Sequence, residues 1–482
     1  MIYYMIAGHT LSHDVQTIIQ VFYPNLHYYL TDKPSPNALT IESRWENHEV
    51  IASLYRNGIL CDTVSLPLSS DIQTLKEQKR MIKASIYTLL KKETGIRPQW
   101  GFVTGVRPAK SINELLDAGY SEEEARTYFI ENYDVMPKKA ELAIEVARWE
   151  RSLLAKNNPD EISIYIGIPF CPTRCLYCSF TSYSLQQYNS KVDPYLDALE
   201  KELQYLSEYS KHYTIKNIYI GGGTPTSLTE SQLERVLSKI HALFSISDSI
   251  EFTVEAGRPD TITEEKLRIM KEYGINRISI NPQTMNESTL RAIGRKHTPD
   301  EIREVFFMAR KLGHDNINMD LILGLPNEGA TEVEKTMKEI QSLAPDSITV
   351  HTLAVKRASM LKENFDQYLM TETQEMEEML AVSNQYAKAM GMHPYYMYRQ
   401  KNMVGNFENV GYCTPHKEGI YNIQIMEEKQ TILAAGAGAS TKIVNLEQNR
   451  IERIFNVKSV DDYITRIDEM IQRKKDGLPK HN

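Results

Sequence analysis

The chain has 482 residues, of which 41% are hydrophobic and 24% are charged, and its formal net charge is −8. This composition is typical of a globular protein, and the length predicts two or three domains. The negative charge argues against a general nucleic-acid binder, and the sequence has neither an apolar run that could span a bilayer nor the pattern of a signal peptide. We therefore expect a cytoplasmic protein.

The N-terminal residues 1–95 have the pattern of an α+β domain. Residues 40–45 and 49–55 are rich in β-branched and aromatic residues, which predicts an antiparallel pair of strands. Apolar residues near helical spacing predict a helix over residues 71–92. This region is expected to fold as a sheet with a helix packed on it.

A mostly helical segment is predicted over residues 96–157. Ser121 and Glu124 have the spacing of a capping box, which marks the start of one helix. Residues 156–160 are polar and contain a proline, so we expect a domain boundary there.

Residues 158–360 alternate between short β-rich runs and helical stretches. The predicted strands cover residues 163–168, 217–220, 251–255, 277–280, 316–323 and 347–352. The predicted helices cover residues 266–273, 299–312 and 331–343, together with one that begins at a Thr229–Gln232 capping box. This alternation is typical of a parallel sheet with helical crossovers. Six such units predict an α/β fold of the partial (β/α)6 TIM-like barrel type.

The pattern changes again after residue 360. We expect a mixed domain over residues 361–482, with a helix over 371–391, a glycine-rich turn over 435–440 and a last helix over 460–474.

Three of the five cysteines, Cys171, Cys175 and Cys178, lie within eight residues directly after the first strand of the predicted barrel. This clustering favours a metal site over a disulfide framework, whose cysteines would be spread along the chain. A zinc site is the alternative, but such sites usually combine two Cys-x2-Cys pairs, and a second pair is missing here. Thiolates are the ligands of iron–sulfur clusters, and three of them would leave one iron of a 4Fe–4S cluster open.

Polar or glycine residues follow the other five predicted strands at the corresponding place. They are Gly221–Pro225 after the second strand, Glu255, Gln283, Asp320 within the fifth strand, and His351 with Ala354. In barrels of this type the active site is built at the carboxyl ends of the strands. We therefore expect these residues to share one site with the cysteines.

The Cys-x3-Cys-x2-Cys motif resembles that of the radical S-adenosylmethionine (SAM) superfamily. The wider pattern is similar to the oxygen-independent coproporphyrinogen III oxidase (dehydrogenase) family, in the segments 165–171, 221–226 and 320–326. The long N-terminal extension and the segment Trp100–Pro108 most resemble the HemZ-type branch of that family. The resemblance implies a 4Fe–4S cluster whose open iron binds SAM, which is cleaved to a 5′-deoxyadenosyl radical.

The resemblance also implies roles for single residues. Cys171, Cys175 and Cys178 would hold the cluster, and Glu255 and Arg295 would pair with the ammonium and carboxylate groups of SAM. The remaining residues implied to line SAM are Tyr165, Tyr177, Gly222, Gly223, Thr224, Gln283, Asp320 and Ala354. Each of these also has an ordinary structural interpretation, such as a turn, a helix cap or a solvated charge.

The implied activity is oxidative decarboxylation of coproporphyrinogen III to protoporphyrinogen IX in porphyrin and haem biosynthesis. The implied partners are a tetrapyrrole substrate and a low-potential electron donor of the flavodoxin or ferredoxin type. Candidate cations for the propionates are Arg258, Lys356, Arg357, Arg399 and Lys401, and His297 and His351 are either proton-transfer groups or structural histidines.

The sequence departs from the family pattern in three places. Gly167 stands where the pattern has a histidine, Phe180 where it has a fourth cysteine, and Ala256–Arg258 where it has an Asn/Asp-Pro element. Phe180 is shared with the related haem chaperones. Two alternatives therefore stay open, a haem-binding or haem-trafficking protein that retains the SAM site, and a radical SAM enzyme that acts on another tetrapyrrole.

Overall fold

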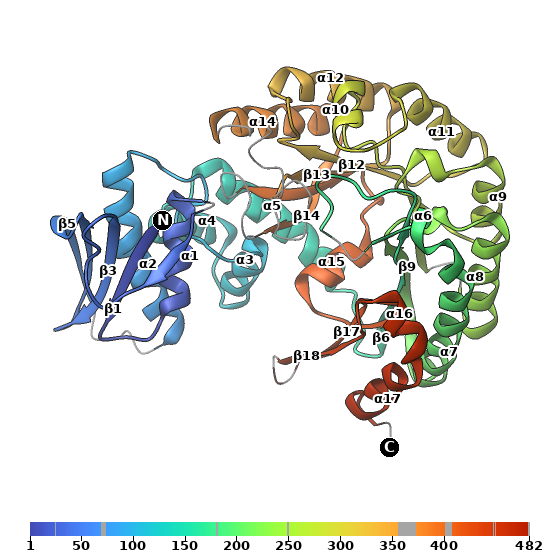
Figure 1. Cartoon of the computed structure of the whole chain (residues 1–482), viewed down its shortest axis with the longest axis horizontal. Coiled ribbons are helices and arrows are strands. Elements are labelled where there is room, and N and C mark those ends of the chain that lie inside the picture. Colours follow the sequence, from blue (N-terminus) through green and yellow to red (C-terminus); the bar gives the residue numbers. More distant parts are fainter. Residues whose placement is uncertain are drawn as a thin grey trace. The chain divides into compact units, whose positions relative to one another are not determined.

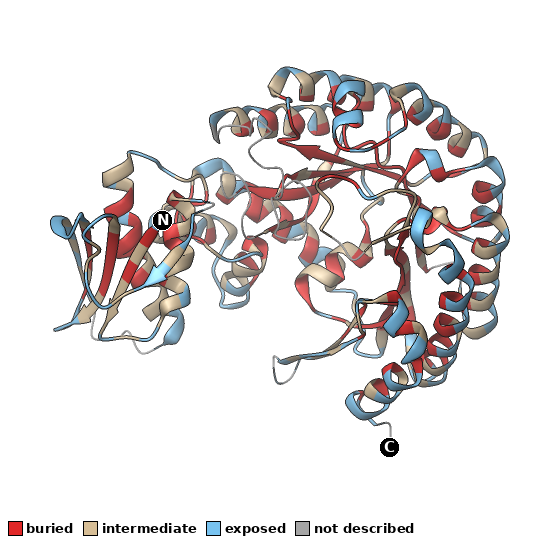
Figure 2. Ribbon diagram, viewed as in Figure 1, coloured by how far each residue is buried: buried red, intermediate tan, exposed pale blue. Residues whose placement is uncertain are grey.

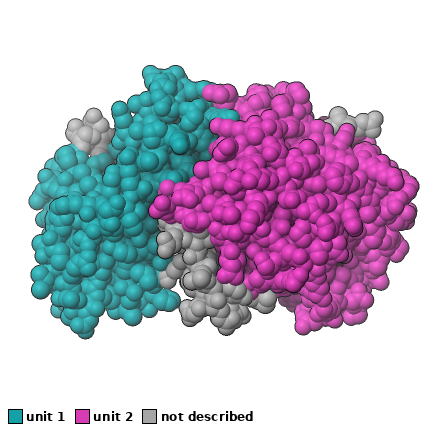
Figure 3. Space-filling model, turned by 90° about the horizontal axis from the view of Figure 1, so that it is seen from above, with its two compact units in different colours: residues 1–145, 398–408 teal, residues 146–397, 409–482 magenta. Residues whose placement is uncertain are grey.

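The computed structural model describes residues 1–24, 26–68, 74–179, 182–247, 250–354, 373–400, 407–446, 448 and 450–480. The chain divides into two compact units, which Figure 3 shows in different colours. The first contains residues 1–145 and 398–408, and the second contains residues 146–397 and 409–482.

A five-stranded sheet forms the first unit, in the order β2-β1-β3-β4-β5. Its strands are β1 (Ile2–Ala7), β2 (Tyr28–Leu30), β3 (Leu39–Glu46), β4 (Glu49–Arg56) and β5 (Ile59–Pro67). Helices α1 (Ser12–Phe22) and α2 (Leu75–Thr94) pack on the sheet and close a core of residues such as Ile18, Leu54 and Ile86. The predicted antiparallel pair is confirmed as β3 and β4.

Helix α2 has clear start and stop signals. The Thr74 side chain accepts a hydrogen bond from the backbone N–H of Glu77, and Gly95 ends the helix in the left-handed conformation at φ +69°. The predicted helix began at residue 71, and residues 69–73 lie outside the described part of the chain.

Three further helices follow, namely α3 (Pro108–Asp117), α4 (Glu122–Tyr133) and α5 (Pro137–Leu154). The Ser121–Glu124 capping box predicted from the sequence is present at the start of α4. The Trp100 indole N–H donates a hydrogen bond of 2.7 Å to Glu408, and the Arg399 guanidinium lies 5.4 Å from the centre of the Trp100 ring. Arg399 also donates to the backbone oxygen of Val103, so this cation is held inside the first unit.

An eleven-stranded sheet organises the second unit, in the order β14-β15-β13-β12-β11-β10-β9-β6-β16-β17-β18. Its centre consists of six parallel strands, β6 (Glu161–Ile168), β9 (Thr214–Gly222), β10 (Glu251–Glu255), β11 (Arg277–Ser279), β12 (Ile317–Leu323) and β13 (Ser347–Thr352). These are the six strands that the alternating pattern predicts. The partial barrel fold is thereby confirmed.

Helices connect these strands and cover the outer face of the curved sheet (Figure 1). They are α7 (Val192–Ser210), α8 (Glu230–Leu243), α9 (Glu264–Glu272), α10 (Glu287–Ala292), α11 (Pro299–Lys311) and α12 (Ala330–Leu343). The predicted capping box at Thr229 and Gln232 starts α8. The central strands are mostly buried, as Figure 2 shows, so the sheet forms the core of the unit.

The last third of the chain extends both edges of this sheet. Strand β16 (Thr431–Ala435) pairs in parallel with β6, and β15 (Glu408–Cys413) pairs antiparallel with β13. The other elements are α14 (Thr373–Ala389), β14 (His393–Arg399), α15 (Ile420–Glu427), β17 (Ser440–Asn445), β18 (Arg450–Phe455), α16 (Val460–Thr465) and α17 (Ile467–Gly477). None of the described helices is long and apolar enough to cross a membrane.

Candidate active site

Cys171 ends β7 (Phe170–Cys171), just after β6, and Cys175 and Cys178 lie on the loop between β7 and β8 (Tyr183–Ser184). Cys171 Sγ lies 3.5 Å from the hydroxyl of Thr224, and the Cys178 backbone N–H donates to the Cys175 carbonyl at 3.1 Å. Burial, together with the charges of Cys178 and Cys175, raises the pKa of the Cys171 thiol to about 11.

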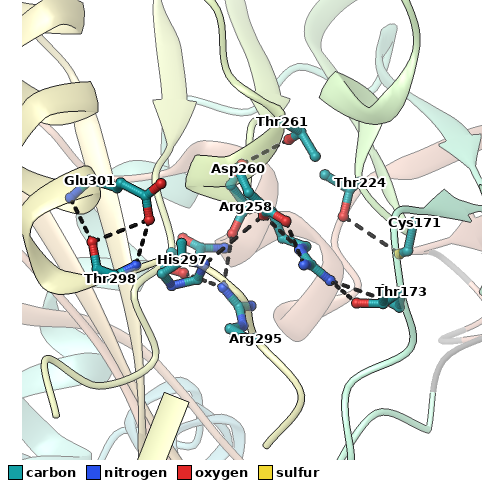
Figure 4. Close-up of polar contacts among 12 residues, drawn as sticks. Cys171, Thr173, Thr224, Arg258, Asp260, Thr261, Arg295, His297, Thr298 and Glu301 are labelled. Carbon is teal, nitrogen blue, oxygen red and sulfur yellow. Dashed lines mark hydrogen bonds and ion pairs between the residues drawn. The ribbon is translucent and has the colours of Figure 1, made fainter. Parts of the chain in front are cut away.

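Arg258, in the segment that follows β10, forms hydrogen bonds with this loop (Figure 4). Its guanidinium is buried and donates two hydrogen bonds to the carboxylate of Asp260, at 2.9 and 2.6 Å. It also donates to the carbonyl and the hydroxyl of Thr173, at 3.1 and 2.8 Å. Thr173 stands between two of the cysteines, so the bidentate ion pair holds the cysteine loop in place.

Gly222 and Gly223 at the end of β9 allow its backbone to lie against the end of β6 and against β7, which carries Cys171. A Cβ atom on Gly223 would lie 2.5 Å from the Phe170 carbonyl oxygen, and Gly222 has φ +112°. The Gly223 N–H donates to the Ile168 carbonyl at 2.8 Å. A side chain at these positions would force the two strand ends apart.

Glu255 ends β10 and points toward the glycine run. Its carboxylate accepts hydrogen bonds from the Tyr219 hydroxyl and from the Gly222 N–H, the latter at 3.2 Å. A Cβ atom on Gly221 would lie 2.8 Å from the Glu255 carboxyl carbon. Burial raises the pKa of Glu255 to about 7, and the charge of Asp320 contributes to the shift.

A stack of tyrosines lies beside this carboxyl group. The ring centres of Tyr219 and Tyr421 are 4.4 Å apart, and Tyr165 stacks at 6.3 Å from Tyr219 and 6.2 Å from Tyr421. The sequence pointed to Tyr165 alone. The alternation of side chains along β9 could have identified Tyr219 from the sequence. Tyr421 lies on α15, far along the chain, where no local pattern points to it.

Arg295 is a buried cation on the loop before α11. It donates to the Asn281 carbonyl at 2.6 Å and to the Tyr177 hydroxyl at 3.2 Å, while its Nε has no hydrogen-bond partner. His297 is also buried, and its Nδ1 lies 4.0 Å from the Asp260 carboxylate. Burial and the charge of Arg295 lower the pKa of His297 to about 4.

Asp320 and Gln283 lie on neighbouring strand ends. The Asp320 carboxylate accepts hydrogen bonds from the side-chain amides of Asn281 and Asn318, at 2.9 and 2.7 Å. His351 Nε2 lies 3.8 Å from the same carboxylate. Gln283 adopts φ +68°, and its backbone N–H donates to the Asp320 carbonyl at 3.0 Å.

The remaining predicted residues are Thr224, Tyr177 and Ala354. Thr224 is buried beside Cys171, Tyr177 contacts Arg295, and Ala354 is half-buried just after β13. Phe180, Lys356, Arg357 and Lys401, which the sequence also singled out, lie outside the described residues. Of the predicted residues, Glu255 and Gln283 lie at or just after the carboxyl ends of parallel strands, whereas Tyr177 and Arg295 lie on loops.

Comparison with known proteins assigns the chain to a family. Residues 165–340 match the model of the radical SAM superfamily. The chain is 38% identical to "Oxygen-independent coproporphyrinogen-III oxidase-like protein HemZ" of Bacillus subtilis over 476 residues, which cover 96% of this chain and 95% of the relative. The chain belongs to the HemZ-type branch of the radical SAM coproporphyrinogen III oxidase-like family.

The chain is also similar to a protein that is named for a different role. The chain is 35% identical to "Heme chaperone HemW" of Bacillus subtilis over 311 residues, which cover 64% of this chain and 76% of that protein. Among solved structures, coproporphyrinogen III oxidase (HemN) from Escherichia coli matches with a TM-score of 0.54 and 22% identity over 67% of this chain and 73% of that chain. The structural match supports the radical SAM fold.

Proposed function

We propose that this HemZ-type protein decarboxylates two propionates of coproporphyrinogen III oxidatively, without oxygen, to give the vinyl groups of protoporphyrinogen IX. The observation that carries the proposal is the half-buried carboxyl group of Glu255 at the end of β10, together with the buried guanidinium of Arg295, which donates to Tyr177 of the cysteine loop. A carboxylate and a guanidinium that are partly removed from water suit the ammonium and carboxylate of the methionine part of SAM.

The thiol loop fits a 4Fe–4S cluster. Cys171, Cys175 and Cys178 supply three soft anionic ligands, which would leave one iron for SAM. Burial disfavours a free thiolate at Cys171, and a cluster would remove that cost because its irons neutralise the charge. Arg258 orients the loop through Thr173.

The residues around the loop fit SAM. The unpartnered Nε of Arg295 is a free donor in a buried place, and Gly222 and Gly223 leave room for a ligand backbone to approach. Asp320 and Gln283 are placed at strand ends where they could bind ribose hydroxyls, and the residues Tyr165, Tyr177, Thr224 and Ala354 complete the proposed site. Bound there, SAM and the cluster would supply a 5′-deoxyadenosyl radical.

For each propionate, one hydrogen atom would pass from the β-carbon to the 5′-deoxyadenosyl radical, and the loss of CO2 and of one electron to an external electron acceptor would leave a vinyl group. The protein contributes orientation and exclusion of water, and the cofactor supplies the chemistry. The proposal includes a low-potential electron donor of the flavodoxin or ferredoxin type.

An anaerobic assay tests this function. The cluster is reconstituted, SAM, reductant and coproporphyrinogen III are added, and protoporphyrinogen IX is measured by mass spectrometry. Cleavage of SAM without decarboxylation would rule out this substrate. Cys175→Ala should abolish the visible absorbance of the cluster, whereas the control Cys61→Ala, at an exposed cysteine of the first unit, should leave it unchanged.

A haem-trafficking role is the second candidate, favoured by the 35% identity to the haem chaperone and by Gly167. A Cβ atom on Gly167 would meet its neighbours at 3.4 Å or more, so packing alone does not demand glycine there. Gly167 therefore stands where the catalytic pattern has a histidine, and the site lacks that imidazole. Stoichiometric haem binding with no SAM cleavage in the same assay would support this role.

A further inference from the structure

Three potential metal ligands converge away from the cysteine loop, in the second unit. His393 starts β14, Cys413 ends β15, and Glu418 lies just before α15. One ligand atom from each residue lies within 4.8 Å of the other two. Cys413 is fully buried, and the side chains of His393 and Glu418 are 11% and 8% exposed.

The distances between these atoms match those of a tetrahedral zinc site. His393 Nε2 lies 3.6 Å from Cys413 Sγ and 3.1 Å from Glu418 Oε1. Zinc binds nitrogen and oxygen at about 2.0 Å and sulfur at about 2.3 Å, so tetrahedral angles place N and S about 3.6 Å apart and N and O about 3.3 Å apart. Two of the three distances between ligand atoms are therefore within a few tenths of an ångström of these values, and the third, between Cys413 and Glu418, is below 4.8 Å.

The arrangement does not suit a Cys–His–Glu catalytic relay. In such a relay the acid and the nucleophile contact opposite ring nitrogens, whereas here Cys413 and Glu418 both face Nε2 of His393. Trp149 stacks on the imidazole with ring centres 3.7 Å apart and planes 19° apart, which fixes the ring in this orientation. Convergence of three ligand atoms on one point is what a metal ion requires.

The charges nearby favour a divalent ion. A thiolate and a carboxylate together carry two negative charges, which Zn²⁺ neutralises, and nitrogen, sulfur and oxygen ligands are its usual set. Arg277 and Glu251 are the charged groups whose fields reach this cluster, and their opposite charges offset each other.

We propose that His393, Cys413 and Glu418 bind a zinc ion, with water in the fourth position. The ion would join the edge strands β14 and β15 to the start of α15, the helix that carries Tyr421. Zinc bound in this way is part of the folded edge of the sheet and is separate from the iron of the cysteine loop.

X-ray absorption at the zinc edge tests the proposal on the full chain with its iron–sulfur cluster in place, because iron is invisible at that edge. After incubation with Zn²⁺ and desalting, we expect about one zinc per chain, with one sulfur at about 2.3 Å and two or three nitrogen or oxygen atoms at about 2.0 Å. Three sulfurs around the zinc would place it in the cysteine loop and overturn the proposal. The proposal would also be overturned if the desalted protein retained no zinc.

Two variants and a control complete the experiment. Cys413→Ser should remove the sulfur from the zinc spectrum, and the matched control Cys61→Ser should not. Glu418→Gln keeps the shape of the side chain. In competition with a chelator, this variant should bind zinc more than about tenfold more weakly. If Cys413→Ser fails to fold, Glu418→Gln decides the question, and an unchanged zinc affinity in a folded Glu418→Gln protein would overturn the proposal.

Discussion

The titration of Glu255 gives the sharpest test of the proposed SAM site. With a pKa of about 7, this carboxyl group is about one-eleventh ionised at pH 6 and about ten-elevenths ionised at pH 8. Only the ionised form pairs with an ammonium group. Relative to a variant that lacks this carboxyl group, the dissociation constant for SAM should therefore fall about tenfold from pH 6 to pH 8, which corresponds to about 1.4 kcal/mol.

The groups that face this carboxyl set the direction of the effect. They are Tyr165, Tyr219, Tyr421, Asp320 and His351. The pKa values of the three tyrosines are raised by burial, so these side chains stay neutral over this range. Asp320 has a lowered pKa and stays ionised. The contribution of Glu255 to the affinity should therefore rise with pH and level off above about pH 8.

Anaerobic calorimetry on the reconstituted protein, from pH 5.5 to 8.5, measures the profile, with Glu255→Gln as the matched variant. At pH 8 the variant should bind SAM about 10- to 100-fold more weakly, since a hydrogen bond to a charged group contributes about 1.5–3 kcal/mol. Its pH dependence should reflect only the titration of SAM itself. Equal slopes for the two proteins would refute the assignment of Glu255 as the ammonium partner.

Two further predictions concern the framework. Gly223→Ala should weaken SAM binding more than tenfold in equilibrium dialysis, because the new Cβ meets the Phe170 carbonyl at 2.5 Å, whereas Gly105→Ala, with no atom within 4 Å, should bind normally. Lys474→Met should lower the free energy of unfolding by about 3–5 kcal/mol in chemical denaturation, because it leaves the fully buried Glu202 without its cation. Glu202→Gln/Lys474→Met should recover part of that loss, and a double variant as unstable as the sum of both single changes would contradict an interaction between the two.

The six central strands were predictable because parallel strands buried on both faces have continuous β-branched runs separated by helical crossovers. The sequence pattern did not predict helix α7, although this helix has 19 residues. It also did not predict β16, which pairs in parallel with β6. The partner of β16 lies about 270 residues earlier in the chain. A local pattern cannot reveal pairing over that distance, so the sequence could not place the C-terminal strands on this sheet.

The site shows the same division between local and distant signals. Cys171 and Glu255 were identifiable because each follows a recognisable strand. Arg258 was read as a candidate propionate ligand, yet it is buried in a bidentate ion pair with Asp260 and holds the cysteine loop. The contact depends on Thr173, which is 85 residues away in sequence, so no spacing rule pointed to it.

Glu255 and Asp320 illustrate how one site can give two carboxyl groups different charges. Both are half-buried, and partial burial alone raises the pKa of each. Contacts with His351 and the amide of Asn318 outweigh burial at Asp320, so its pKa falls, whereas the contacts of Glu255 do not compensate for burial. Near neutral pH, Asp320 is therefore a fixed charge, while the charge of Glu255 depends on its surroundings. A cationic ligand that arrives beside Glu255 would complete its ionisation, and the ligand would thereby create the carboxylate that binds it.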